Sequence, residues 1–299
     1  MANFYMTIGC AASGKSTWCC NNAKNNDVVL DSDFLRLELL GDEKDQSNND
    51  LIFRTMYKRT YNALKEGRNV FYCACNLGMK YRIHLLNQLR AKLTDVIYTA
   101  VVFNTPIDDC RASNAKRGAT GLRTVPDWLF EKQIKQLQLP VQNEGWNKII
   151  VINRYKNALD VYRVYSEVKD KVKNFGSQQN KHHALSLIDH CDGCGRTATI
   201  QKASYNVATA AFVHDYGKAY TATRWPAERD DGQLHYPNHA EYGAYLVLNM
   251  GYNIDVARLV NYHMIPYMDE NAQTTWKKRL GNTMWEDIIE LHKYDELAH

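Results

Sequence analysis

The sequence predicts an α/β domain with a parallel sheet, followed by an all-α domain. Short β-branched runs alternate with longer amphipathic stretches up to about residue 155, which is typical of a parallel sheet covered by helices. A polar stretch at 174–181 follows, and after it the pattern is helical almost throughout. Of the ten histidines, only His84 lies in the first half. The two halves are therefore expected to perform different chemistry.

The pattern gives each element a range. Strands are expected at 4–8, 28–31, 69–73, 96–103 and 148–152. Helices are expected near 15–24, 48–66, 79–93, 106–118, 126–138 and 155–173. We therefore expect a first domain over 1–155, a helical linker over 156–180 and a second domain over 181–299.

A phosphate-binding loop is the most specific motif of the first half. The string Gly9-Cys-Ala-Ala-Ser-Gly-Lys-Ser16 directly follows an apolar strand and leads into a helix. Its glycines let backbone N–H groups face phosphate oxygens, the lysine reaches the β and γ phosphates, and Ser16 is placed for Mg²⁺. The sequence thus predicts a site for ATP or another nucleoside triphosphate with Mg²⁺. Its expected contacts are Gly9, Ser13, Gly14, Lys15, Ser16 and Thr17.

An acid and a base follow the second expected strand. Asp33 and Arg36 are three residues apart and share a face if a helix begins there. The carboxylate could accept a proton from a substrate hydroxyl, and the guanidinium could hold a substrate phosphate. An N-capping aspartate beside a solvated arginine would leave the same pattern.

With these residues, the first half resembles the P-loop kinase domain of polynucleotide 5′-kinases, the end-healing enzymes of phages and bacteria. Beyond the loop and Asp33-x-x-Arg36, the resemblance rests on Asn76-Leu77, Val101–Pro106, Asn114–Gly118, Val125-Pro126, Leu139-Pro140 and Glu144–Trp146. It implies that Asp33 is the general base for a 5′-hydroxyl and that Lys15 takes part in catalysis. It also implies that Arg36 and Asn76 bind the substrate and that Arg117 clamps the donor phosphates from a lid.

Two positions depart from that family. The family usually has an aspartate before the Thr-Asn of the third strand, where this chain reads Ala74-Cys75-Asn76, and an arginine where this chain has Ser113. Either the acceptor differs from an ordinary 5′-end, or Arg111 and Arg123 substitute.

Histidines and aspartates suited to a metal mark the second half. His190, the pair His214-Asp215 and Asp295 are ligands of the kind that hold Mn²⁺, Fe, Co, Ni or Mg²⁺ for hydrolysis of phosphate esters. The pair stands in Ala210-Ala-Phe-Val-His-Asp-Tyr-Gly-Lys218, and this setting resembles the signature of the HD phosphohydrolase superfamily. The resemblance implies that these four residues bind one or two transition-metal ions. His239 and His263 would then hold a second metal or the substrate phosphate, and Lys218 would meet the developing charge.

The other cysteines and histidines of the second half, and His84, are expected to have structural roles. Cys191 and Cys194 have no second pair at zinc spacing unless His182 and His183 contribute, so local packing is the expected role of both cysteines. Packing or surface roles are also expected for the histidines outside the proposed sites, namely His84, His182, His235, His292 and His299.

Composition limits the setting of the protein. The formal charge of +4 and the pI near 8.5 fit a polyanionic partner but fall short of a dedicated nucleic-acid binder. The eight cysteines show no disulfide spacing, and the sequence shows neither a signal peptide nor a long apolar span. We expect a cytoplasmic protein, of a bacterial cell or a phage-infected host, that does not act at a membrane.

Together the two halves predict a nucleic-acid end-healing enzyme. It would phosphorylate 5′-hydroxyl ends with ATP and remove 3′-phosphate or 2′,3′-cyclic phosphate with a metal. RNA ends are favoured over DNA ends because many nucleases leave such ends on RNA, and a ligase would act downstream. Two alternatives stay open: a small-molecule nucleoside or nucleotide kinase joined to a nucleotide phosphohydrolase, and a nucleotide-sensing binding protein.

Overall fold

The computed structural model of the chain describes residues 1–121, 123–155, 157–179 and 185–298. Its contacts divide the chain into two compact units. The first comprises Met1–Gln133 and Pro140–Arg154, and the second comprises Ile134–Leu139 and Tyr155–His299. The helix expected inside a linker thus lies in the second unit. So does the short segment Ile134–Leu139, which we had assigned to the first domain.

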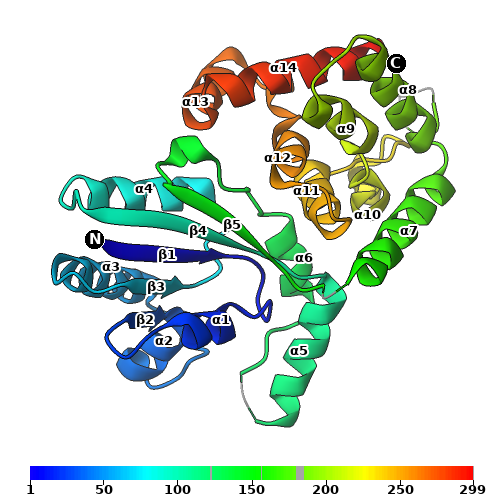
Figure 1. The fold of residues 1–299 in the computed structure, drawn as a ribbon. Helices are drawn as coiled ribbons and strands as arrows, with labels where there is room; N and C mark the ends of the chain where they lie inside the picture. Colours follow the sequence, from blue (N-terminus) through cyan, green and yellow to red (C-terminus); the bar gives the residue numbers. More distant parts are fainter. Residues whose placement is uncertain (122, 156, 180–184, 299) are drawn as a thin grey trace. The chain divides into compact units, whose positions relative to one another are not determined.

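The first unit is built on a five-stranded parallel sheet, as predicted (Figure 1). Its strands are β1 (Ala2–Ile8), β2 (Val28–Asp31), β3 (Val70–Cys73), β4 (Val96–Asn104) and β5 (Lys148–Asn153). They lie in the order β2-β3-β1-β4-β5. The chain therefore reverses direction across the sheet at β1, and the phosphate loop follows this strand. Crevices at such a point, beyond the carboxyl ends of the strands, are where open α/β sheets bind ligands.

Helices cover both faces of this sheet. The helices of this unit are α1 (Lys15–Asn22), α2 (Ser32–Leu40), α3 (Asn49–Lys65), α4 (Met79–Arg90), α5 (Ile107–Ala119) and α6 (Trp128–Ile134), with a 3-10 turn η1 (Gln142–Glu144). On one face, Trp18 of α1 packs on Tyr5 and Phe71. On the other face, Tyr72 contacts Phe4 and the hydroxyl of Tyr81 on α4. Side chains of successive strand residues point to opposite faces, which accounts for the two sets.

Helix α2 is absent from our list of expected helices. It begins because the carboxylate of Asp31 accepts the N–H of Asp33 at 2.9 Å, and it ends at Gly41, which has a φ of 80°. Asp33 and Arg36 therefore lie on a helix, which was the condition for their sharing a face.

A buried ion pair anchors the loop after β3. Arg82 and Glu144 are fully buried, and their two contacts measure 2.7 and 2.8 Å. The remaining guanidinium nitrogen of Arg82 donates to the carbonyls of Asn76 and Leu77 at 3.0 and 2.8 Å. Glu144 also accepts from Trp146 at 3.1 Å. Since hydrogen bonds satisfy both charges, the pair holds the loop at the carboxyl end of β3.

Breaking this pair should destabilise the first unit strongly. Glu144→Gln leaves the Arg82 charge buried without a counterion, and such losses cost about 3–5 kcal/mol. Guanidinium denaturation should show the transition of this unit at a clearly lower midpoint. Glu38→Gln, which breaks the exposed pair with Arg59, is the matched control and should leave that midpoint nearly unchanged. Equal effects of the two changes would contradict this assignment.

The second unit is helical in its described part, as predicted. Its helices are α7 (Ala158–Phe175), α8 (Leu187–Ile200), α9 (Tyr205–Val213), α10 (Lys218–Thr221), α11 (His239–Asn249), α12 (Ile254–Tyr262), α13 (Glu270–Leu280) and α14 (Asn282–Leu297), with 3-10 turns η2 (Ala227–Arg229) and η3 (Ile265–Tyr267). Within this unit, α9 packs against α8, α12 and α14. No helix among the described residues is long and apolar enough to span a membrane.

A glycine lets two elements of this unit approach closely. A Cβ on Gly217 would lie 2.0 Å from the carbonyl oxygen of His239 and 2.7 Å from the nitrogen of Gly243. Only a residue without a side chain allows α11 to pack on the turn after α9. This contact brings His239 next to His214 and Asp215.

Candidate functional site

The phosphate loop connects β1 to α1. Gly14 has a φ of 97°, which favours glycine, and it directly precedes the helix. Lys15 is buried, and its ammonium donates to the carbonyl of Cys10 and to Ser13 Oγ, the latter at 3.4 Å. Of the predicted contacts, three lie in the loop itself, namely Gly9, Ser13 and Gly14. Lys15 and Ser16 lie in the first turn of α1, and Thr17 is exposed on the same helix.

Asp31 is a site residue that our sequence reasoning missed. Its Oδ2 accepts a 2.7 Å hydrogen bond from Ser16 Oγ, the hydroxyl expected at Mg²⁺. Carboxylate and hydroxyl oxygens are suitable ligands for Mg²⁺. The aspartate that the resemblance led us to expect after β3 corresponds to Ala74 in this chain, and Asp31 offers a carboxylate from the end of β2. The sequence signal that could have identified Asp31 is its position as the last residue of an apolar strand.

Asp33 is held by two cations. Its carboxylate pairs with Arg36 at 2.8 Å and with Arg123. Arg36 is buried, donates to Asn49 at 2.9 Å, and its Nε has no hydrogen-bond partner among the described residues. The predicted pair thus exists, and Arg123 joins it. An unsatisfied guanidinium N–H beside a half-exposed carboxylate is suited to an incoming phosphate.

The other predicted contacts of this unit divide into two kinds. The side chain of Asn76 donates to the carbonyls of Thr7 and Ala74, at 2.8 and 3.3 Å, and so links β1 to the loop after β3. Arg117 lies half-buried in the last turn of α5. Arg111 pairs with Asp108, Asp127 and Glu131, and its hydrogen bond to Asp127 raises its pKa. Of the two substitutes considered for Ser113, only Arg123 contacts Asp33.

A candidate metal centre lies in the second unit. His190 on α8, His214 and Asp215 after α9, and Asp295 on α14 are all buried. Asp295 Oδ1 lies 3.0 Å from Nε2 of His190 and 3.2 Å from Nε2 of His214, and Asp215 Oδ2 lies 3.6 and 3.5 Å from the same atoms. Two ligands bound to one ion at about 2.0–2.2 Å lie roughly 3–3.5 Å apart. Asp295 and the two imidazole nitrogens therefore have the spacing of ligands to one ion, and Asp215 Oδ2 lies at the outer limit of that spacing. We call these four residues the first donor group.

A second donor group shares Asp215. Its other oxygen, Oδ1, lies 3.3 Å from Nε2 of His239 and 3.6 Å from Nε2 of His263. These two nitrogens are 3.2 Å apart. The carboxylate thus faces one donor group with each oxygen, an arrangement that could bridge two ions.

The histidines are oriented for metal binding. In three of them Nδ1 lies 2.7–3.0 Å from a backbone carbonyl, namely His214 to Ala211, His239 to Tyr236 and His263 to Val260. A carbonyl can only accept, so Nδ1 carries the proton and Nε2 of the neutral ring keeps its lone pair. The second donor group combines two such nitrogens, those of His239 and His263, with the carboxylate of Asp215, and this donor set fits a divalent transition metal.

Charges in the cluster compensate one another. Burial opposes the charged form of His214, but Asp215 and Asp295 outweigh it and raise the pKa of His214 to about 9. Burial also opposes ionisation of Asp215, yet Lys218 and His214 hold the pKa of this carboxyl well below its usual range. Burial lowers the pKa of His263. A metal ion would replace the cations that now neutralise the carboxylates.

Lys218 reaches the cluster together with an unexpected residue. Its ammonium lies 2.5 Å from Asp215 Oδ2 and donates to Gln178 Oε1 at 3.0 Å. Gln178 is fully buried, and its Nε2 has no hydrogen-bond partner among the described residues. The sequence places this glutamine in the predicted linker over 156–180, because a polar stretch gives no sign that one amide side chain is buried. Lys218 and Gln178 offer N–H donors where a phosphate oxygen could bind.

Two further residues border the first donor group. Tyr267 donates to Asp295 Oδ2 at 2.8 Å. Cys194 Sγ lies 3.7 Å from His190 Nε2 and is one of four donor atoms within 4.8 Å of each other, with His190, His214 and Asp295. Packing alone therefore does not describe Cys194, which one turn of α8 places beside His190.

Neither donor group includes His84, His235 or His292, among the residues that the structure describes. His235 pairs with Asp231 at 3.0 Å on the surface. His182, His183 and His299 lie outside the described residues.

Comparison with known proteins agrees with the division into two kinds of domain. Residues 4–140 match the family described as an AAA domain, and residues 187–293 match the HD domain. The chain therefore carries a P-loop, kinase-like domain followed by an HD domain, and it combines a kinase-type fold with a phosphohydrolase-type fold.

One similar solved structure belongs to the Pnkp1/Rnl/Hen1 RNA repair complex. The identity is 22%, the match covers 46% of this chain and 44% of that chain, and the TM-score is 0.40. This chain thus matches less than half the length of that neighbour, and a likeness at this level does not extend to activity, substrate or partners. No curated protein matches the chain.

Proposed function

We propose that this protein heals nucleic-acid ends, and RNA ends in particular. Its first unit would transfer the γ-phosphate of ATP to a 5′-hydroxyl. Its second unit would remove a 3′-phosphate or open a 2′,3′-cyclic phosphate. One observation carries the proposal: a phosphate loop with a carboxylate beside it and a buried His/Asp metal cluster occur on one chain, so both ends of a break can be processed.

The kinase step follows from the residues around the loop. Lys15 neutralises the β and γ phosphates, while Ser16 and Asp31 would hold Mg²⁺. Asp33 accepts the proton of the attacking hydroxyl. Arg36 and Arg123, which pair with Asp33, would turn toward the substrate phosphates.

The hydrolase step uses the buried cluster. His190, His214, Asp215 and Asp295 would hold one ion, and His239 and His263 with Asp215 would hold a second. A bound divalent metal supplies a Lewis acid and a water of lowered pKa. Lys218 and Gln178 would bind the oxygen on which negative charge develops, and both are buried, which strengthens that contact.

An oligoribonucleotide with a 5′-hydroxyl and a 2′,3′-cyclic phosphate tests the proposal directly. Incubation with ATP and Mn²⁺ should yield a 5′-phosphate and a 3′-end without cyclic phosphate. A DNA strand with a 3′-phosphate and free nucleosides serve as competing acceptors. Faster reaction of mononucleosides would favour a small-molecule enzyme, and ATP binding without turnover at either end would favour a sensor. Either result would overturn the proposal.

Asp33→Asn separates proton transfer from ATP binding. The amide keeps the size of the side chain but cannot accept the proton, so transfer to the 5′-hydroxyl should fall by about 10²–10⁴-fold. ATP binding, measured by calorimetry, should persist. Loss of ATP binding would assign Asp33 to the metal or to the fold instead. Asp42→Asn, an exposed acid in the loop after α2, is the control and should transfer phosphate normally.

A further inference from the structure

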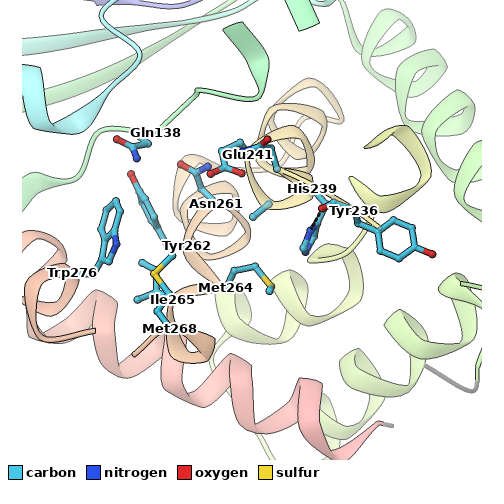
Figure 2. A pocket seen from close by; sticks show the side chains of 12 residues that line it. Gln138, Tyr236, His239, Glu241, Asn261, Tyr262, Met264, Ile265, Met268 and Trp276 are labelled. Atoms are coloured by element: carbon cyan, nitrogen blue, oxygen red, sulfur yellow. Dashed lines mark hydrogen bonds between the residues drawn. The ribbon is translucent and has the colours of Figure 1, made fainter. Parts of the chain in front are cut away.

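A pocket of 290 Å³ lies beside the metal cluster within the second unit (Figure 2). His239, a member of the second donor group, forms part of its lining. Whatever fills this pocket therefore lies next to the proposed reaction centre. Its size is at the lower end of the range for small-molecule sites, about 300–1,000 Å³.

The lining has a polar and an apolar part. Figure 2 shows Glu241 and Asn261 close together, Gln138 above Trp276, and Met264, Ile265 and Met268 in the lower part of the view. Methionine and aromatic side chains contact flat rings favourably. The amide of Gln138 and the carboxyl of Glu241 can hydrogen-bond to the edge of such a ring.

The charge of the pocket excludes a second phosphate. No lysine or arginine is among the described residues that line it, and Glu241 is its only acid. A carboxylate here would repel a phosphate group. The pocket therefore suits an uncharged part of a substrate whose phosphate lies at the cluster.

The wall that carries Gln138 is fixed by hydrogen bonds. Asn261 accepts the N–H of Leu139 at 2.7 Å and donates to the carbonyl of Leu137 at 2.9 Å, and Tyr262 donates to the carbonyl of Leu139 at 2.5 Å. All three bonds are buried. The segment Ile134–Leu139 is thus a preformed part of the pocket and not a passing connection.

From these observations we propose that the pocket binds the terminal nucleoside of the hydrolase substrate. The base lies against Met264, Met268 and Trp276, and Glu241 accepts hydrogen bonds from its amino group. This inference rests on the proposed function and adds the part of the substrate that the HD site recognises. Nucleosides with an exocyclic amino group are expected to bind more tightly than uridine.

Two variants of the full chain test the pocket. Glu241→Gln should raise KM for cytidine 3′-phosphate by roughly 10-fold, because a charge-assisted hydrogen bond is replaced by a weaker one to a neutral amide. Met268→Ala should raise this KM by about five- to tenfold. Because Met268 is 43% exposed, the substitution should not prevent folding. Neither variant should change Mn²⁺-dependent hydrolysis of p-nitrophenyl phosphate, which has no nucleoside. Glu286→Gln, an exposed acid on α14, is the matched control.

A second measurement separates this inference from the proposed function. Calorimetry with cytidine, which carries no phosphate, should show binding to wild type and weaker binding to Glu241→Gln. Hydrolysis of p-nitrophenyl phosphate without cytidine binding would overturn the pocket inference and leave the hydrolase standing. Cytidine binding without any hydrolysis would instead contradict the proposed function. Unchanged KM in both variants would also overturn the inference.

Discussion

The variant His214→Gln/Asp215→Asn should lose the metal of the second unit and its hydrolysis of 3′-ends. His214 belongs to the first donor group, and Asp215 faces the first group with one oxygen and the second with the other. Mutation of residues that only hydrogen-bond to metal ligands already lowers metal affinity by about 10–100-fold. Replacing two ligands should therefore lower it by at least about 100-fold. Metal analysis of the purified variant and a 3′-phosphatase assay measure the two effects.

The substitutions keep the size of both side chains, since Asp215 also contacts the buried ammonium of Lys218. Phosphorylation of 5′-ends should persist, because the phosphate loop belongs to the other unit. The matched control is His235→Gln/Asp231→Asn, which removes a surface pair of the same types and should keep metal and hydrolysis. A variant that stays folded and keeps its metal would refute the assignment of this centre. A folded variant that loses kinase activity would show that the two sites are coupled.

The parts of the site that the sequence predicted are those with local signals. The phosphate loop is contiguous from Gly9 to Ser16, and the His214-Asp215 pair stands in its own setting. Short β-branched runs predicted the five strands, because the composition of such a run is a local property of the sequence.

Residues that reach their site from a distance gave no such signal. Asp31 contacts Ser16, which is fifteen positions away. Asp31 is also the N-cap of α2, and this local role alone is enough to explain an aspartate at that position. Gln178 contacts Lys218 at the candidate metal centre from a polar stretch that composition assigns to a linker. The segment Ile134–Leu139 follows α6 of the first unit but packs in the second. Its three hydrogen bonds go to Asn261 and Tyr262, more than 120 positions away, and no periodicity in one segment reveals such a partner.

Lys15→Ala should abolish phosphate transfer while hydrolysis continues. The ammonium is the cation that the loop itself holds in place, bonded to Cys10 and Ser13. Removing it leaves the β and γ phosphates without this charge as the bond to the leaving group breaks. Cationic groups that act on the transferring phosphoryl contribute about 10³–10⁵-fold, so the rate should fall by at least about 10³-fold.

Transfer from labelled ATP to a 5′-hydroxyl oligonucleotide measures this loss, and 3′-phosphate release without ATP measures the other activity. Lys24→Ala, at an exposed lysine just beyond α1, is the control and should transfer phosphate normally. Because Lys15 is buried, Lys15→Met tests whether the loss comes from the charge or from the volume of the side chain. If methionine restored transfer, the lysine would be a packing residue and the loop would not be the site of the triphosphate. If instead both variants lost 3′-hydrolysis in the absence of ATP, the HD centre would depend on the loop, and two independent reactions on one chain could no longer be maintained.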